Sequence, residues 1–263
     1  MQRRTTCALA LALLPALGCH APSLDLTPRV LFVELDGDLA ADRTSGSLTA
    51  SQKTSWDRLG LDDSVTAFSP RADLHMGPLD ITLDYVASDF EGTGTTDAEL
   101  ELDGVTIAAG TTVESSLDLA VWRLSSTFDF FPTEFADLGA GLGIAAVDFD
   151  AAIVDPIGLA TISADEIVPM PYLALRGGLD WGDLEAEALL GLLAVDVGEY
   201  EASYIDLDLF VRYQVFGGSS RASVAILGGY RLIELDAEYD DGEDRVAFDT
   251  SISGPYLGAT ITF

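Results

Sequence analysis

Apolar and polar residues alternate along much of this chain, and a period of two is the pattern of a β-strand with two different faces. Residues 202–216 show it clearly. One face carries Ile205, Leu207, Leu209, Val211, Tyr213 and Val215, and the other carries Asp206, Asp208, Phe210, Arg212 and Gln214. Residues 78–90 and 169–181 alternate in the same way. The pattern therefore predicts an all-β protein in which one face of each strand is apolar.

Ten segments qualify as strands by this pattern. Each reaches the roughly 9–11 residues that a tilted strand needs to cross a bilayer. If residues 29–40 and one other segment lay outside the sheet, the count would fall to eight. The ten expected strands are 29–40, 64–76, 78–90, 115–130, 135–150, 169–181, 183–196, 202–216, 220–239 and 245–263.

The connections between these strands differ in length in a regular way. The segments 41–63, 91–114 and 151–168 are long, and they alternate with short turns at Gly77, at 132–134 and at Gly182. Long outer loops that alternate with short inner turns are typical of an up-and-down transmembrane barrel. The chain is therefore expected to form a single antiparallel barrel of this kind, with both termini on the periplasmic side.

Two of the expected strands have mixed faces. In 115–130, Arg123 shares a face with Leu117 and Leu119, so we expect the opposite face to meet lipid. That face places Phe128 and Phe130 in an inner aromatic girdle; it holds Ala120, Trp122, Leu124, Phe128 and Phe130. Residues 220–239 show a similar conflict around Arg231 and Ile233.

The polar faces predict a charged lumen. A small barrel has little interior room, and buried charges need partners, so these side chains are expected to pair and fill it. The alternative is a narrow, cation-preferring pore or a ligand pocket, because the expected lumen residues, named at the end of this paragraph, include more carboxylates than arginines. The alternate glycines Gly139, Gly141 and Gly143 predict that a large side chain crosses the lumen at this place, and the expected lumen arginines are the candidates. The expected lumen residues are Asp80, Asp84, Arg123, Arg176, Glu185, Glu187, Asp206, Asp208, Arg212 and Arg231.

The first residues have the features of an export signal. Arg3 and Arg4 precede a short apolar run and small residues, so residues 1–18 are expected to be cleaved. The segment Ala16-Leu17-Gly18-Cys19 resembles a lipobox, which would make Cys19 a lipidated first residue; ordinary cleavage near Gly18 or Ala21 is the alternative. Residues 19–28 then form a tether and 29–263 the barrel domain.

The last residues carry a second signal. Tyr256-Leu-Gly-Ala-Thr-Ile-Thr-Phe263 resembles the recognition signal in the last strand of outer-membrane barrels, with Tyr256, Gly258, Ile261 and Phe263 at the defining places. The whole chain resembles, in organisation, the small Gram-negative outer-membrane barrels of the OmpA and OmpW kind. That resemblance implies an outer-membrane location, with lipid, lipopolysaccharide and the barrel-assembly machinery as partners.

Composition narrows the functions further. A formal net charge of −31 makes nucleic acid a poor partner. The chain has two cysteines and two histidines, and neither a Ser/His/Asp nor a Cys/His arrangement can be assembled, so we expect no enzyme. The acidic segments 240–244 and 62–63 offer hard oxygen ligands, but their spacing matches no calcium loop, and we assign neither a metal nor a cofactor. Nothing in the sequence sets an oligomeric state.

Three functions remain in view. The first is a structural or surface-interaction barrel with a charge-filled lumen, whose long loops contact the outside. The second is a small channel for cations or small solutes. The third is a lipid-anchored, lipocalin-like barrel that binds a small ligand, against which the final-strand signal and the alternating loop lengths argue.

The final-strand signal can be tested directly. Deleting Phe263, or replacing it with a polar residue, is expected to impair assembly, because the terminal aromatic residue is part of the recognised pattern. The amount of folded protein in washed outer membranes measures this. Wild-type levels of the truncated protein would contradict the assignment of the signal.

Overall fold

The fold is known from a computed structural model of the chain. The structure describes residues 21–42, 54–61, 64–97, 99–102, 105–131, 133, 135–157, 160–197, 200–217, 222–240 and 245–263. Among these residues, no helix is long and apolar enough to cross a membrane. The strands are β1 (Ser23–Thr27), β2 (Arg29–Asp42), β3 (Thr54–Ser55), β4 (Val65–Phe68), β5 (Arg71–Met76), β6 (Leu79–Thr95), β7 (Leu100–Leu102), β8 (Val105–Ile107), β9 (Thr112–Asp129), β10 (Ala136–Asp155), β11 (Ala160–Asp180), β12 (Leu184–Val197), β13 (Tyr200–Phe216), β14 (Ser223–Asp240) and β15 (Arg245–Thr262).

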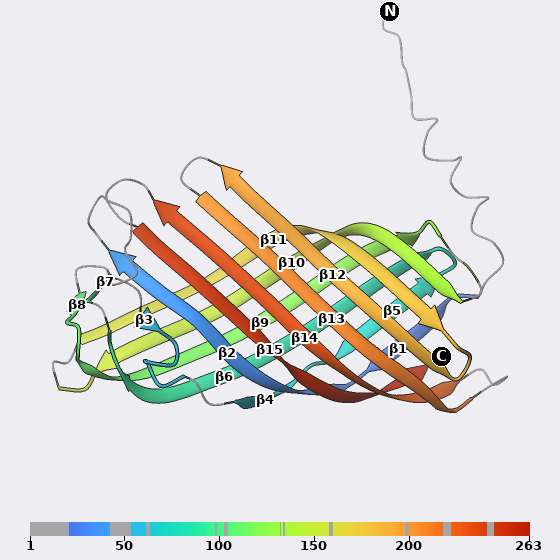
Figure 1. Cartoon of the computed structure of the whole chain (residues 1–263), viewed down its shortest axis with the longest axis horizontal. Coiled ribbons are helices and arrows are strands. Elements are labelled where there is room, and N and C mark those ends of the chain that lie inside the picture. Colours follow the sequence, from blue (N-terminus) through green and yellow to red (C-terminus); the bar gives the residue numbers. More distant parts are fainter. Residues whose placement is uncertain are drawn as a thin grey trace, which may run out of the picture.

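The strands close into an antiparallel barrel of ten wall strands (Figure 1). Eight of them are β6 and β9 to β15, each paired with its neighbours in chain order. The other two are interrupted. β1 and β2 form one wall strand that breaks at Pro28, and β4 and β5 form the next, which breaks at Ser69 and Pro70. Proline has no N–H to donate to a ladder, which accounts for breaks at these places.

The last strand closes the barrel against the first. β15 pairs with β2 along most of its length and with β1 at its end, where Asp25 lies opposite Thr262. Leu24 and Phe263 exchange backbone hydrogen bonds of 3.3 and 3.0 Å. The predicted all-β class, the barrel and the ten-strand count are confirmed, and both described termini lie at the end with the short turns (Figure 1). We refer to the other end as the outer end.

Three expectations about segments need correction. Residues 23–27 were expected in a tether but lie in β1, paired with β5 and β15. The loop expected over 151–168 is mostly strand, because β10 runs to Asp155 and β11 begins at Ala160. The loop expected over 91–114 contains the hairpin of β7 and β8. Apolar residues fall on both faces in 151–154, and glycines alternate with small or charged residues in 91–95, so the period-two pattern was too weak there to extend the strands.

An apolar belt surrounds the half of the barrel near the termini. On β9, Trp122 is 50% exposed whereas its neighbour Arg123 is 3% exposed and faces the lumen. Phe128 and Phe130 are also exposed, as expected for residues in an inner aromatic girdle. The face of 115–130 that the sequence assigned to lipid is therefore the outward, exposed face. Leu142 on β10, Leu173 on β11 and Leu257 on β15 continue the belt around the wall.

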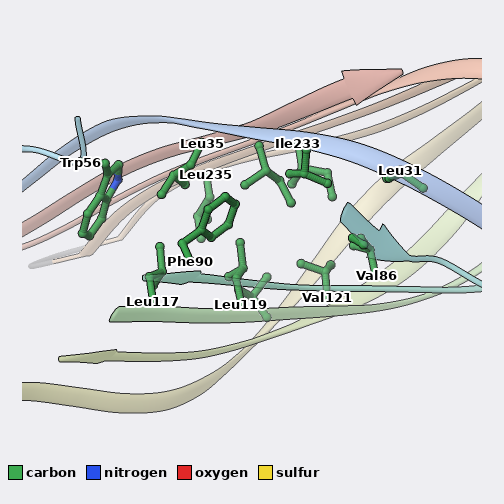
Figure 2. Close-up of a cluster of buried hydrophobic side chains, with 14 of the residues drawn as sticks. Leu31, Leu35, Trp56, Val86, Phe90, Leu117, Leu119, Val121, Ile233 and Leu235 are labelled. Atoms are coloured by element: carbon green, nitrogen blue, oxygen red, sulfur yellow. The ribbon is translucent and has the colours of Figure 1, made fainter. Parts of the chain in front are cut away.

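Toward the outer end of the barrel, the inward face of the wall becomes apolar and the outward face becomes polar. Most of the inward side chains there are apolar and buried, including Phe90, Leu117 and Leu235 (Figure 2), and a few small hydroxyl residues such as Ser88 and Ser115 are buried among them. On the outward face, Asp89, Asp118 and Asp150 lie opposite one another on β6, β9 and β10. The charged lumen predicted from the polar strand faces therefore does not extend through the outer half. Ile233 and Arg231 both point inward, which resolves their conflict in the sequence.

A segment between β2 and β4 fills this outer half. Trp56, Leu59 and Leu61 are almost completely buried among the inward apolar residues (Figure 2). The Trp56 backbone N–H donates to the Gly37 carbonyl over 3.1 Å, and Thr95 N–H donates to the Arg58 carbonyl over 2.7 Å. Part of the region expected as an outer loop is therefore a stopper inside the barrel; we call residues 54–61 the stopper segment.

Two tyrosines lie across glycines on neighbouring strands. A Cβ at Gly143 would come within 2.2 Å of the Tyr172 ring, and one at Gly229 within 2.5 Å of the Tyr256 ring. Each glycine is the direct cross-strand partner of its tyrosine. An aromatic ring laid over a strand glycine is a known device that supports curved sheets. At Gly143 the crossing side chain is thus a tyrosine, not one of the expected arginines.

The adjacent glycines on β14 provide a matched test of this packing. A Cβ at Gly229 would also lie 2.4 Å from the Leu209 carbonyl oxygen, whereas one at Gly228 meets Leu257 at an ordinary 3.4 Å. We expect Gly229→Ala to lower the free energy of unfolding by about 1–3 kcal/mol, as overpacking does, and Gly228→Ala to leave it nearly unchanged. Urea unfolding of both variants in lipid vesicles measures this, and equal stabilities would contradict the packing described.

Candidate functional site: the barrel lumen

Three buried aspartates form the centre of the lumen. Asp84 comes from β6, and Asp206 and Asp208 come from β13; all three have no measurable exposure. Alternation puts them inside, because their neighbours Leu83 and Leu209 are on the lipid side. Such carboxylates are costly to bury unless each is paired and hydrogen-bonded.

Four arginines provide that pairing. Arg123 Nη1 lies 2.8 Å from Asp206 Oδ2, and Arg231 Nη2 lies 3.0 Å from the same oxygen. Arg231 Nη1 is 2.5 Å from Asp84 Oδ1. Arg29 bridges Asp84 and Asp208, with Nη1 2.8 Å from Asp208 Oδ2, and Arg71 Nη1 lies 3.7 Å from that oxygen. We call these seven residues the central ion cluster.

Tyrosines and backbone complete the cluster. The Tyr204 hydroxyl donates to Asp206 Oδ2 over 2.9 Å, and the Tyr256 hydroxyl donates to Asp208. Arg29 Nε donates to the Ser69 carbonyl over 3.1 Å, at the break between β4 and β5. The guanidinium of Arg29 also lies over the Tyr256 ring, 5.1 Å from its centre. Charge-assisted bonds of this kind are roughly twice as strong as neutral ones.

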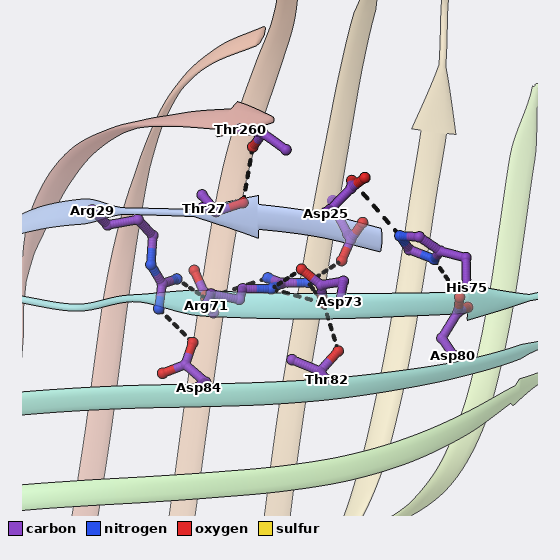
Figure 3. A network of polar contacts seen from close by, with 12 residues as sticks. Asp25, Thr27, Arg29, Arg71, Asp73, His75, Asp80, Thr82, Asp84 and Thr260 are labelled. Atoms are coloured by element: carbon purple, nitrogen blue, oxygen red, sulfur yellow. Dashed lines mark hydrogen bonds and ion pairs between the residues drawn. The ribbon is translucent and has the colours of Figure 1, made fainter. Parts of the chain in front are cut away.

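A second layer lies between the central ion cluster and the termini (Figure 3). Arg71 binds Asp73 and Glu187 at 2.8 and 3.0 Å. Arg212 binds Glu185 and Asp25 at 2.6 and 2.7 Å. Arg176 contacts Asp80 and Glu187, and His75 Nδ1 is 2.5 Å from Asp80. Carboxylates outnumber arginines here, whereas arginines outnumber carboxylates in the central ion cluster.

Little space remains between these side chains. A cavity of about 10 Å³ lies among Asp25, Arg71 and Glu187, and another of about 10 Å³ lies beside Leu31 and Arg231. A volume of this size holds about one water molecule. Asp25 Oδ1 and Arg71 Nη1 line the first cavity without a hydrogen-bond partner among the described residues, so one water would suit it.

The structure places every expected lumen residue inside these two layers. The central layer holds Asp84, Arg123, Asp206, Asp208 and Arg231, and the second holds Asp80, Arg176, Glu185, Glu187 and Arg212. Whether they form a filled network or line a pore stays a prediction. Sequence reasoning missed Arg29, Asp25 and Arg71. Leu24 and Leu26 flank Asp25 in regular alternation, so that pattern was present in the segment assigned to a tether.

The residues of the C-terminal signal divide between the two faces. Tyr256 is 1% exposed and belongs to the lumen, whereas Ile261 and Phe263 are exposed on the apolar belt. A Cβ at Gly258 would lie 2.7 Å from the Pro28 carbonyl oxygen and 3.0 Å from Arg29. The role of these residues in assembly stays a prediction, and residues 1–20, including Cys19, lie outside the described residues.

The described part of the chain contains no group of three or more His, Cys, Asp or Glu side chains arranged to hold a metal ion. Of the acidic segments considered from the sequence, residues 62–63 and 241–244 lie outside the described residues. His75 lies in the second layer, between Asp25 and Asp80, on the side of the termini.

Comparisons with known proteins concern the architecture. No family model matches the chain, and no curated protein matches it. Among solved structures, it is similar to the outer-membrane protease OmpT of Escherichia coli (11% identity, 92% of this chain and 96% of the other, TM-score 0.48). It is also similar to the toluene transporter TodX of Pseudomonas putida (10%, 92% and 89%, 0.34) and to a Pseudomonas aeruginosa FadL homologue (8%, 92% and 90%, 0.32).

At these identities and TM-scores the likenesses carry no argument about activity. The closed sheet, the external apolar belt and the charged lumen define the class by themselves. The chain is an outer-membrane β-barrel protein.

The contribution of the central ion cluster to the free energy of unfolding can be tested by substitution. Asp84→Asn removes one of three negative charges from among four arginines, and breaking a buried ion pair costs about 3–5 kcal/mol. Asp118→Asn is the matched control, because Asp118 faces outward between Asp89 and Asp150. Like charges directly opposite are destabilising, so we expect the control to be neutral or slightly stabilising.

Urea unfolding in lipid vesicles, followed by heat-modifiable electrophoretic mobility, measures both variants. An Asp84→Asn protein as stable as the wild type would show that the cluster contributes little to holding the barrel together.

Proposed function

We propose that this protein is a non-conducting outer-membrane barrel with a structural or surface-interaction role. The observation that supports it most strongly is the central ion cluster, in which every carboxylate and guanidinium is paired across the lumen. An ion passing through would have to separate partners that are fully buried. Each such separation would leave an unpaired charge at the level of the membrane.

The stopper segment supports the same proposal from the outer end. Trp56, Leu59 and Leu61 fill an apolar region that offers no hydration to an ion. Two barriers of different chemistry would therefore stand in series, one ionic and one apolar. A cation channel is the alternative, favoured by the carboxylate excess in the second layer, yet each of those carboxylates contacts an arginine or His75.

The outer end would carry the contacts with the surroundings. The hairpin of β10 and β11 extends to Ile157, whose side chain is among the most exposed apolar groups, and β7 and β8 form a small second sheet there. Lipid and lipopolysaccharide are the proposed partners of the wall, and the barrel-assembly machinery that of β15. Cleavage after residue 18 and lipidation of Cys19 belong to the same proposal. No catalytic role is proposed, since His75 is enclosed by lumen carboxylates.

Planar-bilayer recording tests the proposal. The folded wild-type protein is expected to give no stable conductance steps. Trp56→Ala with Leu59→Ala removes part of the apolar barrier only, and Arg123→Ala with Asp206→Ala removes part of the ionic barrier only, so both are expected to stay silent. The four substitutions together are expected to conduct, because neither barrier then spans the lumen.

Heat-modifiable mobility serves as the control that each protein is folded. Discrete steps from the folded wild type would overturn the proposal, and cation selectivity of those steps in a salt gradient would favour the channel instead.

A further inference from the structure

The strands β11 and β12 are paired along only part of their length. Their ladder runs from the turn at Gly182 as far as Leu173 and Leu192. Farther out, residues 160–172 of β11 pair with β10 alone, and residues 193–197 of β12 pair with β13 alone. Figure 1 shows the two strands separating toward the outer end. Among the described residues this gap, which we call the seam, has a free strand edge on each side.

Two prolines account for the end of the ladder. Trp181 N–H donates to the Leu184 carbonyl on β12 over 2.8 Å. Backbone N–H groups of successive residues point to opposite sides of a strand, and the register of β11 with β10 is unbroken. Every second residue before Trp181 therefore turns its nitrogen toward β12, and Pro171 and Pro169 are among them. Because proline has no N–H, β11 offers β12 no donor at either position.

The edge of β12 keeps its hydrogen-bonding groups. Leu184 faces β11 at the turn, so by the same alternation Ala194 and Asp196 also turn their N–H and carbonyl groups toward the seam. Neither residue has a hydrogen bond on that side among the described residues. An unpaired edge with two donors and two acceptors is a template for an added strand.

The free edge of β12 begins where the outward face of the wall becomes polar. Ala194 is the register partner of Ser203 on β13. The Ser203 hydroxyl donates to Asp236 on β14 over 3.0 Å, at an exposed position. Polar side chains face outward where the wall leaves the hydrocarbon, because lipid disfavours them. A molecule in the water outside the cell can therefore reach this edge.

The charge around the seam favours a basic partner. Residues 160–172 and 193–197 contain three acidic residues and no lysine or arginine. On β10, Asp150 is exposed and is the register partner of Asp165, at the margin of the seam. A second copy of this chain would bring the same acidic residues and a net charge of −31, so it would be repelled. A basic segment would be attracted.

We propose that the seam binds an extended, basic segment of another polypeptide, which adds to β12 as a strand. Its backbone pairs with Ala194 and Asp196, and its basic side chains are attracted by the acidic residues around the seam. The alternate side chains face the lumen, where Met170 and Tyr172 are buried, and are apolar. The inference rests on the proposed surface-interaction role and gives that role a place and a class of partner.

Binding of a synthetic peptide tests the proposal. The probe is a fluorescently labelled peptide of four Lys-Val repeats, added to the folded full chain in nanodiscs of zwitterionic lipid and followed by fluorescence anisotropy. We expect saturable binding. The same peptide with a methyl group on every backbone nitrogen carries the same charge but has no donors for β12, so it is expected to bind at least about tenfold more weakly.

A matched pair of variants locates the binding on β12. Ala194→Pro removes a donor of the free edge, whereas Ala194→Val keeps it. We expect Ala194→Pro to bind the Lys-Val peptide at least about tenfold more weakly, with the affinity of Ala194→Val unchanged. Valine at both 169 and 171 returns two donors to β11, so this double variant is expected to extend the ladder and exclude the peptide. Heat-modifiable mobility shows that each protein is folded.

Three results would each show the proposal to be wrong. The first is a wild-type protein that does not bind the Lys-Val peptide saturably. The second is an N-methylated peptide that binds as tightly as its parent, which would mean that charge alone attracts it. The third is a folded Ala194→Pro protein with the affinity of Ala194→Val; if Ala194→Pro does not fold, the two peptides decide. None of these depends on conductance, so a failure of the proposed closed barrel is distinguishable from a failure of this site.

Discussion

The constraint on which this structure depends is that backbone polar groups in hydrocarbon must be hydrogen-bonded within the protein. A closed barrel meets that demand, and here β15 closes it against β1 and β2. The closed wall then creates a second demand, since its interior must be filled. Among the described residues, side chains fill the space around the ion pairs, and the two cavities beside them measure about 10 Å³ each.

The interior of the barrel is filled in two different ways along its length. At the level of the belt it is apolar outside and charged inside, and above the belt it carries carboxylates outside and apolar groups inside. The reason is the surrounding medium. Lipid forbids outward charge, so charged side chains there point inward and must pair with one another, whereas water above the membrane accepts outward carboxylates and drives apolar groups inward. This inversion also accounts for much of the mixed patterning on β9 and β14.

The sequence allowed the barrel, its ten wall strands and the inward placement of charges such as Asp206 and Asp208 to be predicted, because period-two alternation is local. It did not reveal that the outer lumen is apolar. There, Leu117 and Leu119 point inward on the same face as Arg123, and one strand cannot tell which medium lies on either side. The stopper segment was also missed, because Trp56 reaches its site through tertiary packing rather than through a strand pattern. Gly143 did predict a crossing side chain, but the partner, Tyr172, depends on cross-strand register.

The central claim is that paired charges and apolar packing close the lumen. Potassium efflux from vesicles loaded with salt tests it most directly, with the folded protein reconstituted at increasing density. The account predicts an efflux rate equal to that of protein-free vesicles at every density. A rate that rises in proportion to the number of folded barrels would contradict it.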